Sequence, residues 1–235
     1  MIKLDRRAWM AGAGAASLAP LARAAEPVAA YDYLFLDLRD AEGTTPARAY
    51  ANAVRAQQAS IAAAGGTVLG LFTPQIGWVA RQAALLVRWD GAAPGRSGLI
   101  TNLTRDKTVL FGQRARLAPS PRPTSPAPLW PGGIYVHRWF VVKTKDVPQF
   151  IDLSVEGWRD FESRFDTQIY GLFTADRSQT DLQKGVRRLL LLTRYASHGV
   201  WEASRDPSTA AMAAFQRRSA LTRDTWNAST LFVPL

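Results

Sequence analysis

The feature that most constrains the fold of this chain is an internal repeat. Gly70-Leu71-Phe72-Thr73 recurs 101 residues later as Gly171-Leu172-Phe173-Thr174, and at the same offset the apolar run Tyr33–Leu38 falls on Ile134–Trp139. Two further blocks recur in the same order along the chain, namely 86–89 as 192–195 and 103–106 as 221–224. Blocks that keep their order predict two copies of one structural unit.

A proline-rich segment separates the two copies. Six prolines fall within residues 119–133, and this spacing favours an extended, semi-rigid connector. The sequence therefore predicts a first unit at 26–118, a linker at 119–133 and a second unit at 134–235. Each unit has about 100 residues, which is a normal domain size.

Each unit shows the same order of elements: strand, helix, strand, strand, helix, strand. This is the ferredoxin-like order, and it predicts an α+β fold with two tandem ferredoxin-like repeats. Their antiparallel sheets should face each other with the helices outside, leaving a cavity between the sheets. The strands are expected at 31–38, 67–73, 82–89 and 108–117, then at 134–142, 168–174, 186–195 and 226–233; the helices at 45–64, 98–105, 146–164 and 208–221.

The N-terminus has the three-part plan of an export signal. Arg6-Arg7 precede a weakly apolar stretch rich in Ala and Gly, and Ala22-Arg23-Ala24 is a small-residue cleavage pattern. The arginine pair followed by Ala8-Trp9-Met10 resembles a twin-arginine signal. The resemblance implies a signal peptide at 1–25 and a periplasmic bacterial protein that is exported already folded.

Composition narrows the classes of partner and chemistry. The formal net charge is +10, of which the expected signal carries +3, and no Lys/Arg-rich run of the nucleic-acid type occurs. We therefore expect no nucleic-acid partner, and no apolar run is long enough to span a bilayer. The absence of Cys excludes thiolate chemistry and disulfides, and two histidines are too few for a zinc site with three His ligands. We expect no metal site.

The second unit resembles the NIPSNAP family of the dimeric α/β-barrel superfamily. The resemblance is carried by the strand 134–140, the helix with Phe150 and Trp158, and the segment Arg194-Tyr195-Ala196-Ser197 followed by Trp201-Glu202 and Arg205. The family has a strand with a central Arg, matched by Arg138, and a Tyr-x-Ser step before a helix. The resemblance implies a dimeric α/β-barrel type of fold. The first unit shows it only faintly, because Asp37 stands where Arg138 stands.

The candidate ligand-binding residues all lie in the second unit. They are Tyr135, His137, Arg138, Trp139, Arg194, Tyr195 and Ser197. His137 could hold a proton or ligate a haem iron, or it could be a core histidine bonded to the backbone. Arg138 could bind a carboxylate, or it could form an ion pair with Asp37 across the pseudo-twofold axis.

Two functions of different class follow. The first is an exported protein that binds a small apolar or aromatic molecule, or a protein partner, without catalysis and without a cofactor. The alternative is an oxidoreductase of the dimeric α/β-barrel type, either a cofactor-free monooxygenase or a haem enzyme that uses His137. The sequence leaves open a monomer with an internal pseudo-dimer or a homo-oligomer, and whether the protein is an enzyme.

Overall fold

The computed structural model describes residues 29–91, 93, 95–125, 127–233 and 235, so the expected signal at 1–25 lies outside the described residues. The strands are β1 (Ala30–Leu38), β2 (Gly66–Ile76), β3 (Gln82–Trp89), β4 (Val109–Pro119), β5 (Ile134–Lys143), β6 (Thr167–Ala175), β7 (Val186–Tyr195) and β8 (Thr222–Val233). The α-helices are α1 (Pro46–Ala63), α2 (Arg96–Thr104), α3 (Val147–Arg164), α4 (Gln179–Gln183), α5 (His198–Ala203) and α6 (Ala210–Ser219).

Local sequence signals explain where α1 begins and ends. The Thr45 hydroxyl accepts a hydrogen bond from the Arg48 backbone N–H at 3.3 Å, and Pro46 occupies the first turn, where its missing N–H costs nothing. After the helix the chain reverses at Gly65, which has a φ of +76° that a side chain would disfavour. The sequence predicted this helix at 45–64, in agreement with the structure.

The strands form one closed antiparallel barrel in the order β1-β3-β2-β8-β5-β7-β6-β4, and β4 pairs back to β1. Strands of the first half are neighbours, as are those of the second, and the halves join where β2 pairs with β8 and β4 with β6. The two sheets that were expected to face each other as separate sheets are therefore joined into one barrel. Pairing across the joints satisfies the backbone groups that free edge strands would expose.

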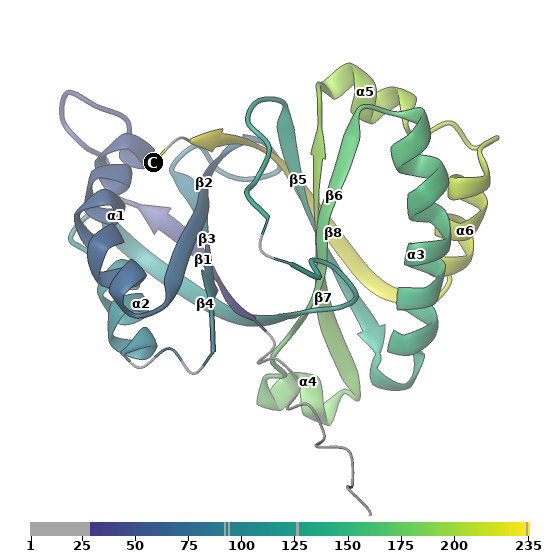
Figure 1. Cartoon of the computed structure of the whole chain (residues 1–235), viewed down its shortest axis with the longest axis horizontal. Coiled ribbons are helices and arrows are strands. Elements are labelled where there is room, and N and C mark those ends of the chain that lie inside the picture. Colours follow the sequence, from purple (N-terminus) through teal and green to yellow (C-terminus); the bar gives the residue numbers. More distant parts are fainter. Residues whose placement is uncertain (1–28, 92, 94, 126, 234) are drawn as a thin grey trace, which may run out of the picture.

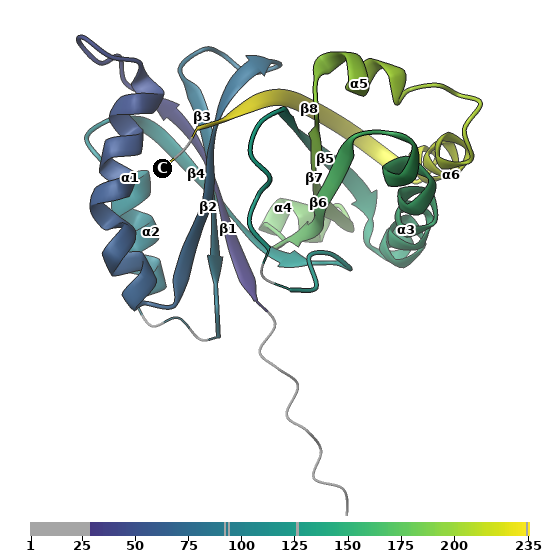
Figure 2. The same ribbon diagram turned by 45° about the horizontal axis from the view of Figure 1, so that its top comes forward.

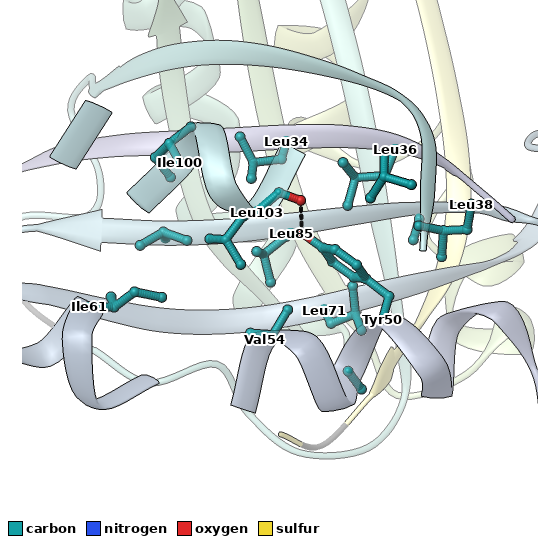
Figure 3. Close-up of a cluster of buried hydrophobic side chains, with 14 of the residues drawn as sticks. Leu34, Leu36, Leu38, Tyr50, Val54, Ile61, Leu71, Leu85, Ile100 and Leu103 are labelled. Atoms are coloured by element: carbon teal, nitrogen blue, oxygen red, sulfur yellow. Dashed lines mark hydrogen bonds between the residues drawn. The ribbon is translucent and has the colours of Figure 1, made fainter. Parts of the chain in front are cut away.

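Helices cover the outside of the barrel on two opposite sides. In Figure 1, α1 and α2 lie against the sheet of the first half, and α3 and α6 lie against that of the second, while Figure 2 shows α5 above the second half. On the first side, Leu34, Leu36 and Leu85 of the sheet pack with Tyr50 and Val54 of α1 (Figure 3). The Tyr50 hydroxyl donates to the carbonyl oxygen of Leu103 at 3.1 Å, which ties α1 to α2.

The barrel interior is largely filled rather than hollow. Buried side chains from both halves meet there, among them Tyr31, Phe72, Tyr135, Phe173 and Leu192. The expected cavity between the two halves is present only in part of the interior, where a space of about 730 Å³ is lined by residues of both halves, including Tyr33 and Trp139. Both inner faces carry large apolar residues, and their burial stabilises the closed barrel by roughly 25 cal/mol per Å² of apolar surface.

The linker 119–133 packs on the barrel instead of acting as a free connector. Leu129 is buried in the interior cluster, and Arg122 forms an ion pair with Glu162 of α3 at 2.8 Å. The hydroxyls of Tyr135 and Tyr170 donate to the carbonyl oxygens of Trp130 and Ala127 at 2.6 and 3.2 Å. The linker thereby closes the barrel end at which Tyr135 lies.

Two departures from the expected elements lie in the second half. The short helix α4 was not predicted, although the Ser178 hydroxyl caps it; α5 lies where the resemblance implied a helix after Ser197. Strand β8 begins at Thr222 instead of at Trp226, so block 221–224 lies mainly in a strand, whereas block 103–106 lies at the end of a helix. In the part of the chain that the structure describes, no helix is long and apolar enough to cross a membrane.

Candidate functional site

The alternation of strand β5 divides the predicted site residues between two sides of the sheet. Tyr135, His137 and Trp139 point into the barrel interior, where they contact the rings of Tyr33 and Phe72. Arg138 points to the opposite side, toward the helices. Because side chains alternate along a strand, neighbouring residues of one motif cannot line one cavity. The seven candidates therefore do not form a single site.

A cavity of about 340 Å³ lies between the outer face of the second half's sheet and helices α3, α5 and α6. We call it the outer cavity. Its apolar walls include Val136, Phe161, Leu191 and Phe215. Its polar lining comprises Arg138, Thr193, Tyr195, Ser204, Arg205, Gln216, Arg218, Ser219, Thr222, Thr225 and Asn227. A mostly apolar pocket with convergent polar groups is the usual form of a small-molecule site.

Besides the exposed Arg205, two guanidinium groups, those of Arg138 and Arg218, give the outer cavity its charge. Arg218 comes from α6 and is only 4% exposed; its Nη1 donates to Ser154 Oγ at 3.2 Å. Its Cζ lies 4.5 Å from the ring centroid of Phe215 and 5.1 Å from that of Phe140. Burial, followed by the nearby Arg138, lowers the pKa of Arg218 to about 9. Burial also lowers the pKa of Arg138.

Neither guanidinium has a carboxylate partner among the described residues. The interpretation that Arg138 pairs with Asp37 is wrong, because Asp37 pairs with Arg81 at 2.6 Å on another part of the barrel. Tyr195 cannot neutralise the pair either, since burial raises the pKa of its phenol and keeps it protonated. Unpaired charges away from solvent are costly, so an anionic ligand would stabilise this cluster.

Trp158 adds a further donor without an acceptor. Its side chain is 1% exposed and lines the outer cavity, and its indole Nε1 has no hydrogen-bond partner within the described part of the chain. Nearly all buried donors in proteins are paired. An oxygen-bearing ligand in this cavity would face three side chains that need an acceptor or a negative charge.

Sequence reasoning missed Arg218, and Trp158 entered it through the helix that carries the family resemblance, without being named as a candidate site residue. The signal for Arg218 was present, because Ala211, Ala214 and Arg218 are buried and recur at helical spacings of three and four along α6. A charged residue on the apolar face of a helix indicates either a buried pair or a site. The lack of an acceptor near Trp158 depends on tertiary packing, and no sequence pattern predicts it.

The remaining predicted residues, Arg194 and Ser197, have structural partners. Arg194 donates from Nη1 to Asp166 at 2.7 Å and from Nε to the carbonyl oxygen of Gly132 at 3.3 Å. Ser197 caps α5 by accepting from the Val200 backbone N–H at 3.2 Å. Both residues therefore hold loops around the second half, and neither lines the outer cavity.

His137 is buried in the barrel interior, and both of its ring nitrogens are occupied. Nδ1 lies 3.0 Å from the Tyr33 hydroxyl, and Nε2 lies 3.1 Å from Thr230 Oγ1. Thr230 donates its own proton to the carbonyl oxygen of Tyr135 at 2.9 Å, so it accepts from Nε2–H, and Nδ1 accepts from Tyr33. Burial lowers the pKa of His137 to about 3, and the ring is therefore neutral.

Comparison with known proteins supports the fold class. No family model matches the chain, and no curated protein matches it. Among solved structures, an anthrone oxidase-like protein matches with a TM-score of 0.58 at 12% identity, covering 89% of this chain and 93% of its own. A candidate monooxygenase from Lactobacillus acidophilus matches with 0.55 at 7% identity, covering 87% and 94%. A haem-binding protein from Thermus thermophilus matches with 0.50 at 12%, covering 89% and 92%.

These neighbours are dimeric α/β-barrel proteins of a ferredoxin-like superfamily, and this chain has their fold. Their names also correct two expectations. They are named for monooxygenase, oxidase, chlorite dismutase and haem-binding roles, which contradicts the interpretation of a binder without catalysis and favours the oxidoreductase alternative. The expectation that no cofactor is used is contradicted as well, because a haem-binding protein shares the fold; haem becomes a candidate cofactor.

Neither His137 nor the lining of the outer cavity fits a haem iron, however. His137 offers no free ring nitrogen, and displacing Tyr33 or Thr230 would break a completed hydrogen-bond chain. In the outer cavity the side chains of a ligating type are Tyr195 and Met212, and the positive charge of Arg138 acts on Tyr195, which disfavours a cationic iron.

Proposed function

We propose that the protein is an oxidoreductase that oxidises an acidic phenol or enol with dioxygen in the outer cavity. The observation that carries the proposal is a pair of guanidiniums without a carboxylate partner in the described chain, namely the buried Arg218 and the partly buried Arg138. The names of the structural neighbours support the class of reaction.

The arginine pair would stabilise the substrate as its anion. A phenolate or enolate oxygen beside Arg138 and Arg218 gains charge-assisted hydrogen bonds in a site of low dielectric constant, so the substrate ionises more easily. The indole N–H of Trp158 can donate a further hydrogen bond to a substrate oxygen. Groups fixed in place before reaction are the main source of this kind of stabilisation.

Ionisation is the step that makes reaction with dioxygen feasible, because the anion is far richer in electrons than the neutral molecule. For a substrate with an enolisable methylene group, the balanced change is R₂CH₂ + O₂ → R₂C=O + H₂O. One oxygen atom enters the carbonyl group, the other leaves as water with the two methylene hydrogens, and dioxygen is the oxidant. The apolar walls at Phe161, Leu191 and Phe215 would exclude bulk water from the anion.

The test is dioxygen uptake with anthrone, and 9,10-dihydroanthracene serves as the control because it cannot enolise. We expect one dioxygen consumed per anthraquinone formed. Arg138→Met should lower kcat/KM about 100-fold or more, Arg138→Lys should retain part of the activity, and Arg217→Met, which removes an exposed arginine of the same helix α6, should change nothing. Equal rates in wild type and Arg138→Met would contradict the proposal.

A second series of the same assay contains added haemin. The absorption spectrum shows whether haem binds, and the rate shows whether bound haem changes the reaction.

We also propose the finer assignments that the sequence suggested: tandem ferredoxin-like halves, a NIPSNAP-like second half and export to the periplasm through a twin-arginine signal. The matching strand orders, β4-β1-β3-β2 and β8-β5-β7-β6, support the tandem halves. N-terminal sequencing of protein recovered from the bacterial periplasm tests the signal. We expect cleavage after Ala24 or close to it, and replacement of Arg6 and Arg7 by Lys should keep the protein in the cytoplasm.

A further inference from the structure

The barrel has a second cavity, at the end opposite to the linker. It has a volume of about 730 Å³. It lies beside the parts of β4 and β8 that have no partner strand in the other half. Strand β4 pairs with β6 only through 117–119, and β8 pairs with β2 only from Ser229 onward. The residues of β4 and β8 that precede these pairs, including Gln113 and Trp226, border the cavity. We call this cavity the barrel opening.

The floor and walls of the barrel opening are aromatic. Tyr33, Phe35, Trp78, Trp139 and Trp226 line it. Trp139 and Trp226 are stacked with an interplanar angle of 13° and ring centroids 6.1 Å apart, while Phe35 and Trp78 meet edge to face. Trp226 is 43% exposed, which is unusual for so large an apolar side chain. Such walls suit a flat aromatic molecule, because it can stack on Trp226 or meet the other rings edge-on.

The rim of the barrel opening is basic. Four arginines, Arg114, Arg116, Arg177 and Arg188, line it together with one carboxylate, that of Asp176. Arg114 and Arg188 have acidic partners, namely Asp32 at 2.7 Å and Asp181 at 3.1 Å. Arg116 and Arg177 have no ion pair with any described carboxylate. A ligand in this cavity would therefore place a negative group at the rim.

We propose that the barrel opening is a second binding site, distinct from the outer cavity, for a flat aromatic molecule that carries a negatively charged group. The rings enter between Trp226 and the walls, and the anionic group faces Arg116 and Arg177. Strand β8 separates the two sites, because Trp226 lines the barrel opening whereas Thr225 and Asn227 line the outer cavity. The proposal does not depend on the oxidation reaction.

The test is isothermal titration calorimetry of the whole protein with 1-pyrenesulfonate and with the neutral analogue 1-pyrenemethanol. We expect the sulfonate to bind at least about fivefold more tightly than the alcohol, and the preference should fall as salt is added. Trp226→Ala should weaken sulfonate binding about three- to tenfold. Arg177→Met should weaken it about two- to fivefold and leave the alcohol unaffected.

Two control variants make the result specific. Trp130→Ala removes an exposed tryptophan that lines neither cavity, and Arg138→Met alters only the outer cavity; both should bind the sulfonate like the wild type. The altered positions 177 and 226 are exposed, so the variants should fold, which circular dichroism verifies. The proposal is overturned by the absence of sulfonate binding at about 1 mM, by equal affinity for both probes, by wild-type affinity in Trp226→Ala, or by loss of binding in Arg138→Met.

Discussion

At the scale of single residues, the hydrogen-bond chain through His137 fixes its protonation state. Tyr33 donates to Nδ1, and Nε2–H donates to Thr230, so a second ring proton has no acceptor. The pKa of His137 falls to about 3 through burial, against about 6.5 in the unfolded chain. The unfolded state therefore binds more protons below pH 6.5. The stability that the neutral ring provides is complete above pH 6.5 and is lost as the pH falls toward 3.

We therefore predict that His137 contributes a loss of about 1.4 kcal/mol in the free energy of unfolding for each pH unit between 6 and 4. Urea denaturation of wild type and His137→Gln at several pH values measures it. The variant should lose this part of the slope, whereas His198→Gln, which removes the other histidine, should keep it. A wild-type slope unchanged by His137→Gln would show that the ring is not held neutral.

The charge of Arg138 should also have a measurable effect on the free energy of unfolding. Its guanidinium is partly buried near Arg218 and has no carboxylate partner in the described chain, so the folded protein holds two like charges together. Replacing such a charge by an apolar side chain of similar length is often neutral or stabilising. We predict that Arg138→Met, which should lower kcat/KM about 100-fold or more, leaves the free energy of unfolding unchanged or raises it by about 1–2 kcal/mol. Thermal and urea denaturation without ligand test this, and a clear loss of stability would assign Arg138 a structural role.

At the scale of elements, the contact between α3 and α6 forms one wall of the outer cavity. Gly157 of α3 faces the ring of Phe215 of α6 so closely that a Cβ would overlap the ring. Gly98 of α2 is also helical, but a Cβ there would meet no atom within 4 Å. We predict that Gly98→Ala raises stability by about 0.5–1 kcal/mol through helix propensity, and that Gly157→Ala lowers it by about 1–3 kcal/mol because the helices must separate. Chemical denaturation of both variants tests the difference, and equal effects would contradict the close contact.

The sequence predicted individual helices and strands better than it predicted contacts between them. Helix α1 was predicted within one residue at each end, because Thr45, Pro46 and Gly65 are local signals that act through backbone geometry. Helix α4 and the start of β8 were missed, because their positions depend on how the second half packs. Arg138 was singled out as a ligand-binding residue or as the partner of Asp37, and the choice between them required the packing of both halves. The side of the sheet that Arg138 faces likewise depends on the register of β5 against β7 and β8.

At the scale of the whole molecule, barrel closure makes the two halves depend on each other. Each half's sheet has an inner face that is buried only by the other half, with Tyr31, Tyr33 and Leu86 on one side and Tyr135, Phe173 and Leu190 on the other. The repeat and the element order predicted two units, but no sequence pattern predicts that β2 pairs with β8 and β4 with β6. Such pairing depends on contacts between residues far apart in the chain.

We predict, as a consequence, that neither half folds alone. Separate expression of residues 29–118 and 119–235 should give insoluble or unfolded chains, because each exposes a large apolar face and the unpaired ends of two strands. Co-expression should restore a soluble one-to-one complex, since the linker stays with the second half that it packs against. Size-exclusion chromatography and circular dichroism measure this, and the uncut chain should unfold in a single transition. A stable, folded monomer of either half would show that the barrel interior is not needed for folding. The packing of the helices on the outer faces would then be the main source of stability.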